Sequence, residues 1–370
     1  MNIATAIATI ALLTGPTQSN DSIRTLEEFE VSARAVSETT KSSTPVFGLD
    51  AREMRSRGIL NISDAMRRLP GVTLKDYGGA GGMKTVAVRG LGAQHTGVSI
   101  DGVPISDARS GQIDLSRYSL DNLSGIRLLI GDGDDIFIPA RNASTPSLLE
   151  ISTQTINFSN TFRHRLTARL NAGSFKHFGG YLNWQYTPSG KFSMGINGEY
   201  TYAKNNYPFT LHNINLITHE RRNNSRMKSA TGDLNICWRP TGRVDFHAKA
   251  HYYDSYRQLP GQVRYYTNYS RETLHERNFF AQAGMRSRLS SVVSLRADLK
   301  YNWDNSSYRD PTYPGGVRDA DYYQREAYAT ATVMATPHSY WLMAYAADYV
   351  NTSLTTFQVN NPDKHPIRHT

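Results

Sequence analysis

Two glycine-rich segments hold residue types that bind phosphate or calcium in other proteins. Residues 78–85, GGAGGMKT, are similar to a phosphate-binding loop, but that loop needs glycine directly before its lysine, and Met83 stands there. Residues 131–135, GDGDD, are similar to the start of an EF-hand calcium loop, but Phe137 and Ala143 occupy the positions that require glycine and glutamate. We therefore predict a polar turn at each segment and no metal site.

Nucleophilic catalysis has no support in the sequence. No serine, histidine and aspartate combination stands in a nucleophile elbow, and His95 fits a hydrogen-bonded loop residue. Cys237 is the single cysteine, which excludes an intramolecular disulfide and a cysteine metal cluster. We predict that the chain is not an enzyme and holds no cofactor.

Two dipeptide steps, Arg89-Gly90 and Asp101-Gly102, follow the short apolar runs 85–88 and 97–100. Glycine tolerates positive φ, and Asp-Gly is a strong signal for a two-residue hairpin turn. Both steps end strands on what could be one edge, a pattern compatible with an ion pair or turn bond between Arg89 and Asp101.

These steps belong to residues 46–153, which we predict to fold as one small α+β unit. Asn61 can cap a helix whose apolar positions Ile62, Ala65, Met66 and Leu69 follow helical spacing. The sequence Leu-Pro-Gly at 69–71 ends that helix, and strands follow at 72–75, 85–88 and 97–100.

The composition fits a membrane protein built from strands. The 370 residues carry a formal net charge of +9 and are 39% hydrophobic, and no run of 18 or more apolar residues predicts a transmembrane helix. Barrel strands turn only alternate side chains toward lipid, and the 22 Tyr, 13 Phe and 4 Trp suit aromatic girdles. The basic residues are spread along the chain, so we expect no nucleic-acid partner.

The first 45 residues read as a leader and an arm. The apolar run 3–13, followed by small and polar residues, predicts a signal peptide at 1–19, although no lysine or arginine precedes it. Residues 20–45 are rich in Ser, Thr and Glu and predict a flexible arm. Its β-like patch at 26–33 could add a strand to a partner's sheet or pair within its own domain.

Beyond Gln154 apolar and polar residues alternate with period two. We predict nine amphipathic strands there, at 162–172, 178–187, 192–202, 233–239, 244–251, 279–288, 292–303, 323–335 and 340–350. Short links at 188–190, 240–242, 289–291 and 336–339 alternate with long ones near 204–228, 256–276 and 304–322. Such asymmetry is typical of an outer-membrane barrel and favours it over a soluble β-sandwich.

Five segments in this order resemble the TonB-dependent receptors of Gram-negative outer membranes: LEEFEVSA at 26–33, ISDA at 62–65, LPGV at 69–72, VRG at 88–90 and IDGVP at 100–104. The resemblance covers about 25–153 and, more loosely, the first strands after it. It implies an α+β plug domain at 46–153, followed at 154–370 by the N-terminal part of an antiparallel transmembrane β-barrel.

The resemblance also implies roles for particular residues. The plug's structural motif would be Leu69, Pro70, Gly71, Val72, Arg89, Gly90, Asp101 and Gly102, and the TonB box would be Glu28, Phe29, Glu30, Val31, Ser32 and Ala33. The expected substrate contacts are Tyr77, Met83, Gln94 and His95, within the segments 77–83 and 94–96, together with the long loop 207–226.

The implied function is uptake of a scarce nutrient, of the ferric siderophore or cobalamin class, with glycans also possible. The implied partners are TonB, outer-membrane lipid, the nutrient ligand, and a surface lipoprotein or the remaining barrel chain. Residues 130–135 and 143–147 depart from the family's late-plug pattern. Nine strands cannot close around a plug where the family has 22, so we expect a truncated or split chain. The alternatives are an exported binding or adhesion protein without transport and a non-functional fragment.

Overall fold

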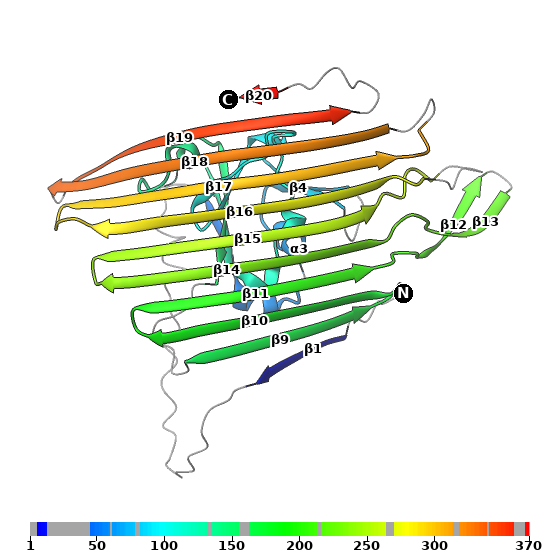
Figure 1. The fold of residues 1–370 in the computed structure, drawn as a ribbon, viewed down its shortest axis with the longest axis horizontal. Helices are drawn as coiled ribbons and strands as arrows, with labels where there is room; N and C mark the ends of the chain where they lie inside the picture. Colours follow the sequence, from blue (N-terminus) through cyan, green and yellow to red (C-terminus); the bar gives the residue numbers. More distant parts are fainter. Residues whose placement is uncertain are drawn as a thin grey trace, which may run out of the picture.

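The computed structural model shows a small mixed unit lying against one face of a long antiparallel sheet (Figure 1). No helix in the described part of the chain is long and apolar enough to cross a membrane. The described residues are 6–12, 45–59, 61–77, 82–131, 133, 135–154, 163–213, 216–263, 270–313, 318–338, 340–358 and 367–369.

The mixed unit, here called the plug unit, runs from β2 to β8. Its five-stranded sheet has the order β2-β7-β8-β5-β6 and is mixed because β5 and β8 are parallel, while β3 and β4 form a separate ribbon. The strands are β2 Val46–Asp50, β3 Val72–Asp76, β4 Lys84–Val88, β5 Thr96–Ile100, β6 Val103–Ile105, β7 Leu123–Ile130 and β8 Ser147–Thr153. The strands predicted from the sequence at 72–75, 85–88 and 97–100 correspond to β3, β4 and β5.

Short helices connect the strands of the plug unit. They are α2 Ala51–Ser56, α3 Ile62–Met66, α4 Ala140–Ala143, and the 3₁₀ helices η1 Ala93–His95, η2 Leu115–Arg117 and η3 Leu120–Asn122. The Asn61 side chain accepts a hydrogen bond from the Asp64 N–H at 2.9 Å, so the predicted cap is confirmed. The helix ends at Met66, earlier than predicted, and Leu69 N–H closes the next turn onto Met66 O.

The predicted apolar face of α3 packs into the core of the plug unit. Its members at 62, 65, 66 and 69 are at most 5% exposed, and they pack with β-strand residues such as Ile126, Leu128 and Leu149. Phe280 of the long sheet belongs to the same apolar cluster. The core of the plug unit therefore extends to the inner face of the sheet.

Both Gly-containing steps form the tight turns that the sequence predicts. Arg89, Gly90, Asp101 and Gly102 all have positive φ, between 50° and 82°. The second step links β5 to β6 as a two-residue hairpin, with Ile100 opposite Val103. No ion pair or turn bond joins Arg89 to Asp101 among these described residues; the Asp101 carboxylate contacts Thr153 and Lys249 instead.

The long sheet contains the nine predicted strands in sequence order. They are β9 His164–Gly173, β10 His177–Ser189, β11 Phe192–Ala203, β14 Met227–Thr241, β15 Val244–Gln258, β16 Thr273–Arg288, β17 Val293–Asp310, β18 Arg318–His338 and β19 Trp341–Gln358. β1 Ala6–Leu12 pairs antiparallel with β9, and β20 Ile367–His369 pairs with β19. The strand order starts at β1 and ends at β20, so the described sheet is open.

The connections between these strands differ at the two ends of the sheet. The end with the β10–β11, β14–β15, β16–β17 and β18–β19 turns is called the short-turn end, and the other is called the long-loop end. The long loops are shorter than predicted because β15 to β18 extend into them. The loop after β11 holds a hairpin that the sequence did not predict, formed by β12 Pro208–Asn213 and β13 Leu216–Arg221.

The two faces of the long sheet have opposite polarity. The face toward the plug unit buries charged groups, among them Lys249, Glu276 and Asp298, each at most 6% exposed. The other face exposes large apolar side chains such as Leu170 and Leu299, at 65% and 62% exposed. This arrangement, apolar outside and polar inside, is that of a strand wall in lipid.

Two predictions concern the N-terminal region. Ala6–Leu12, inside the proposed signal peptide, forms β1, and the signal peptide itself stays a prediction. The TonB-box candidate at 28–33 lies outside the described residues.

Candidate functional site

The Leu-Pro-Gly-Val and Val-Arg-Gly motifs meet directly in the plug unit. The Arg89 N–H donates to Gly71 O at 2.8 Å, and Val72 lies opposite Val88 in the β3–β4 ribbon. Gly71 has a φ of 72°, a conformation that glycine adopts without strain. These residues shape the turn and the ribbon that carry the loop after β3.

Three loops of the plug unit come together at the long-loop end of the sheet. They are the described ends of the loop after β3, residues 77 and 82–83, the segment 91–95 around η1, and the loop 106–118 after β6. The Lys84 N–H donates to an Asp114 carboxylate oxygen at 2.9 Å, which ties the first loop to the third. A β-carbon placed on Gly111 would lie 3.5 Å from the Gln94 β-carbon, so the second segment also borders the third. We call this gathering the plug apex.

A buried ion-pair network fixes the plug apex to the sheet. Arg117 donates to Asp304 at 2.6 Å and to Glu276 at 2.9 Å, across a separation of more than 150 residues in the chain. Arg257 lies 2.8 Å from Glu276 and 3.3 Å from Asp114. Each of these five side chains is at most 15% exposed.

Burial and the neighbouring carboxylates shift the pKa of the Arg117 guanidinium in opposite directions. Burial alone lowers the pKa of its guanidinium, but the carboxylates of Asp304 and Glu276 outweigh burial and raise that pKa well above its ordinary value. The neighbouring Tyr118 also has a raised pKa, chiefly because burial disfavours the phenolate. The network therefore holds a permanent cation between two carboxylates.

Arg109 is the most accessible arginine of the plug apex that contacts the sheet. Its backbone N–H donates to the Asp107 carboxylate at 2.8 Å, which forms a tight turn. Its guanidinium donates to Ser306 Oγ at 3.0 Å and lies 5.2 Å from the ring centre of Tyr322. The side chain is 28% exposed. Sequence reasoning missed both Arg109 and Tyr322, because the chain separates them by more than 200 residues.

A second set of anchors lies under the β5–β6 hairpin. Asp101 accepts from the Thr153 N–H at 2.8 Å and from Lys249 Nζ at 2.9 Å. Burial raises the pKa of Asp101, but Lys249 and the Thr153 hydrogen bonds outweigh burial, so the pKa lies below its ordinary value. Lys300 forms a buried pair with Glu326 at 2.8 Å and donates to Pro104 O.

The late plug segments that depart from the family pattern lie between β7 and β8. There the backbone N–H groups of Ala140 and Arg141, in α4, donate to the Asp348 carboxylate at 3.3 and 2.8 Å. Asn142 donates to Gly102 O at 3.0 Å. The segment therefore contacts both β19 and the β5–β6 hairpin.

The predicted substrate residues lie at or near the plug apex. Tyr77 is 55% exposed, Met83 is half-buried, and Gln94 and His95 are exposed. The long loop 207–226 belongs to the long-loop end and begins with Tyr207, 43% exposed. Beside the plug apex, a cavity of about 190 Å³ reaches from Ser116 to the inner face of β11 and β14, where it is lined by Glu199 and Thr231.

Within the described residues, no group of three or more His, Cys, Asp or Glu side chains could hold a metal ion. The plug apex instead offers exposed polar groups, aromatic rings and one accessible guanidinium. These groups are of the kinds that can contact a ligand by hydrogen bonds, stacking and charge.

Comparison with known proteins finds a matching domain family and several solved structures with a similar fold. Residues 37–137 match the TonB-dependent Receptor Plug Domain family. The fold is similar to the copper transporter OprC, with a TM-score of 0.67 and 13% identity over 85% of this chain and 46% of that one. It is also similar to the ferric enterobactin receptor of Pseudomonas aeruginosa, with a TM-score of 0.62 and 15% identity over 87% and 50%.

A siderophore receptor of Acinetobacter baumannii, PiuA, has a TM-score of 0.62 and 11% identity, over 85% of this chain and 46% of that one. The chain thus spans about half the length of these solved structures. The chain carries a TonB-dependent receptor plug domain followed by antiparallel barrel strands, and its fold is that of the TonB-dependent receptors. The family and these neighbours are receptors and transporters and not enzymes.

Proposed function

We propose that this chain acts in the uptake of a scarce nutrient across the outer membrane. The nutrient binds at the plug apex, and the inner-membrane protein TonB, powered by the proton gradient, pulls on the arm before the plug unit. No covalent bond is made or broken, so the chain is not an enzyme. In this proposal the plug domain is 46–153, barrel strands follow from 154, and a signal peptide at 1–19 directs export.

One observation carries the proposal: the three plug loops gather at the long-loop end of the sheet. A ligand arriving among the long loops would meet residues such as Tyr77, Gln94 and Arg109. The buried pairs of Arg117 with Glu276 and Asp304 join that meeting point to the sheet. In this proposal a pull on the arm has to break or rearrange these pairs before the plug unit can move relative to the sheet.

For the ligand we propose a ferric siderophore first and cobalamin second. Two of the solved structures with this fold, the ferric enterobactin receptor and PiuA, are siderophore receptors, which favours the first class. Arg109 would supply a cation and Tyr322 an aromatic face to an anionic or aromatic chelate. The partners in this proposal are TonB, the nutrient and outer-membrane lipid, with a surface lipoprotein or a further barrel chain completing the assembly.

The test is energised uptake in cells that carry the gene in its native context. Cells receive radiolabelled ferric siderophores of several classes or labelled cobalamin, with and without a protonophore. The variant lacks Glu28 to Ala33, and the matched control lacks residues 36–41 of the same arm. We expect the first deletion to abolish uptake and leave ligand binding intact, and the control deletion to change neither.

Other results of the uptake experiment would favour one of the alternative functions. Binding that continues without protonophore-sensitive uptake would identify an exported binding or adhesion protein. Neither binding nor uptake of any probe would indicate a non-functional fragment. Uptake that survives the deletion at 28–33 would overturn the assignment of the TonB box.

A further inference from the structure

Two cavities lie along the inner face of the same two strands, β14 and β15. One is the cavity of about 190 Å³ beside the plug apex, which Thr231 of β14 and Tyr253 of β15 help to line. The other has a volume of about 440 Å³, lies nearer the short-turn end, and is lined among others by Asn235 of β14 and Lys249 of β15. We call them the apex cavity and the short-turn cavity.

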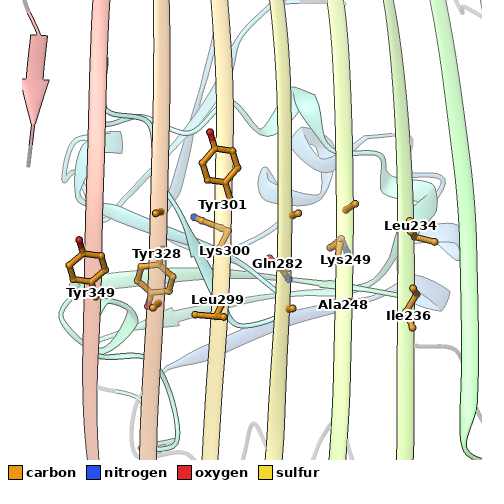
Figure 2. Close-up of a pocket in the computed structure, with 15 residues that line it drawn as sticks. Leu234, Ile236, Ala248, Lys249, Gln282, Leu299, Lys300, Tyr301, Tyr328 and Tyr349 are labelled. Atoms are coloured by element: carbon orange, nitrogen blue, oxygen red, sulfur yellow. The ribbon is translucent and has the colours of Figure 1, made fainter.

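One inward-facing residue on each strand separates the two cavities. Side chains alternate along a strand, and Lys249 of β15 reaches Asp101 of the plug unit at 2.9 Å, behind the strands in Figure 2. The next inward residue of β15 toward the long-loop end is His251, and Asp233 lies directly opposite on β14. The lining positions on either side of them are four residues apart on each strand, about 14 Å. We call Asp233 and His251 the barrier layer.

The barrier layer is buried and belongs to one register row of the sheet. His251 Nδ1 lies 2.8 Å from an Asp233 carboxylate oxygen, and the two side chains are 3% and 5% exposed. Asn197 of β11 lies opposite Asp233, and Phe280 of β16 lies opposite His251. Both of these neighbours are buried as well. The row therefore presents a continuous buried level across four neighbouring strands.

The plug unit meets the barrier layer through an aromatic ring and not through a charge. The ring centres of His251 and Tyr118, which follows η2 in the plug unit, are 5.5 Å apart, and Phe280 lies 5.0 Å from the same imidazole. Within the described residues, no hydrogen bond or ion pair joins Asp233 or His251 to the plug unit. His251 Nε2 is buried without a partner there, so it can hydrogen-bond water or a hydrophilic solute that enters this level.

Charged contacts hold the plug unit to the sheet on both sides of the barrier layer. On the long-loop side Arg117 pairs with Glu276, and on the short-turn side Lys249 pairs with Asp101, each at 2.9 Å. Separating such a pair leaves buried charge without a partner, whereas separating a tyrosine ring from an imidazole breaks only a ring contact. The barrier layer is therefore the level at which the plug unit parts from β14 and β15 at the smallest electrostatic cost.

Both cavities are lined by polar groups and by charges of both signs. Glu199 and Lys84 line the apex cavity together with hydroxyl groups such as that of Thr231. Asp245 and Arg286 line the short-turn cavity. A solute beside β14 and β15 therefore meets a hydrophilic surface that does not favour one sign of charge.

We propose that the nutrient passes between the plug unit and strands β14 and β15, and that the barrier layer closes this route at rest. When TonB pulls on the arm, movement of Tyr118 away from His251 joins the apex cavity to the short-turn cavity. The polar lining makes a hydrophilic solute the class that this route admits. The route rests on the proposed function, whereas the barrier layer can be tested without a nutrient.

The barrier layer is tested by ionic current, which needs neither a nutrient nor TonB. The full chain, purified from outer membranes in the assembly that it forms there, is inserted into a planar lipid bilayer in potassium chloride. We expect a several-fold larger current through the double variant Asp233→Ser, His251→Ser than through the unaltered protein, because small side chains join the two cavities. Asn183→Ser is the matched control: Asn183 lies opposite Asn197 in the same row but lines neither cavity, so the current should not rise.

Cys237 reports whether the current follows the proposed route, because this single cysteine lines the short-turn cavity. A cationic methanethiosulfonate reagent should reduce the current of the double variant and have no effect once Cys237→Ser is added. Circular dichroism checks that each variant keeps its strand content. Equal currents through the unaltered protein and the double variant, or a current that the reagent leaves unchanged, would overturn the barrier layer.

The route is tested separately by narrowing the short-turn cavity in the uptake experiment described above. Cys237→Trp should lower protonophore-sensitive uptake of the labelled probe several-fold and leave its binding unchanged. Leu234→Trp, on the outward face of the same strand (Figure 2), should change neither. Normal uptake by Cys237→Trp would overturn the route. Uptake absent from the unaltered protein would refute the proposed function and the route together, and the current alone would then judge the barrier layer.

Discussion

Replacing Arg117 by methionine should loosen the plug apex from the sheet. The substitution keeps the length of the side chain but leaves Glu276 and Asp304 as buried carboxylates without the cation that lies 2.9 and 2.6 Å away. Removing one partner of a buried ion pair typically costs about 3–5 kcal/mol, because the remaining charge is uncompensated. Arg257 still contacts Glu276, so we expect the lower end of that range.

Hydrogen exchange followed by mass spectrometry measures this loss locally. A cost of about 3 kcal/mol raises the opening constant of the loop 106–118 and of β4 roughly a hundredfold, with exchange accelerated by the same factor. The matched control is Arg57→Met, which breaks a pair with Glu53 of similar length, 2.5 Å, in which the two side chains are 48% and 35% exposed. An exposed pair of this kind contributes about 0–1 kcal/mol, so its loss should barely change exchange.

The comparison between the two variants tests whether the buried ion-pair network fixes the plug apex to the sheet. If Arg117→Met and Arg57→Met accelerate exchange in the plug unit equally, the buried network does not fix the plug apex and the reasoning from burial is wrong. A double variant that also carries Asp304→Asn should recover part of the loss, because it removes one uncompensated charge. No recovery would count against the pairing seen here.

Three further predictions concern other residues of the plug unit. The pKa of Asp101 is lowered in the folded state, so its contribution to folding stability is present above the unfolded pKa of about 3.9 and disappears as pH falls through the folded pKa. Asp101→Asn should therefore reduce the loss of stability at acid pH, measured as unfolding midpoints over a pH series. An unchanged loss of stability at acid pH would contradict this prediction. Gly102→Ala should cost more stability than Gly90→Ala, because both glycines have positive φ but only a β-carbon on Gly102 would lie against a guanidinium, 2.5 Å from that of Arg296. Gly90→Ala should cost about 1–2 kcal/mol. Equal shifts of the two unfolding midpoints in denaturant would refute the steric argument. Arg109→Gln should weaken ligand binding about tenfold and change the free energy of unfolding by less than ~0.5 kcal/mol. An unchanged affinity of the variant for the ligand would remove Arg109 from the proposed site.

Local patterns in the sequence determined the elements of this protein. The nine strands follow from period-two alternation, which depends only on the side chains of each strand and the two faces they meet. The Asp101-Gly102 hairpin and the Asn61 cap follow from the conformational preferences of a few adjacent residues. The order of the motifs was enough to indicate the receptor fold.

Only the tertiary structure decided which charged residues meet. Asp101 pairs with Lys249 rather than Arg89, and Arg117 pairs with Glu276 and Asp304, because the inner face of the sheet presents these partners to the plug unit. Nothing in the local sequence distinguishes these inward charges from any other polar position of an alternating strand. The plug apex is likewise a product of the tertiary structure, because the hydrogen bonds of Asp114 and Arg117 bring together loops and strands that lie far apart in the chain.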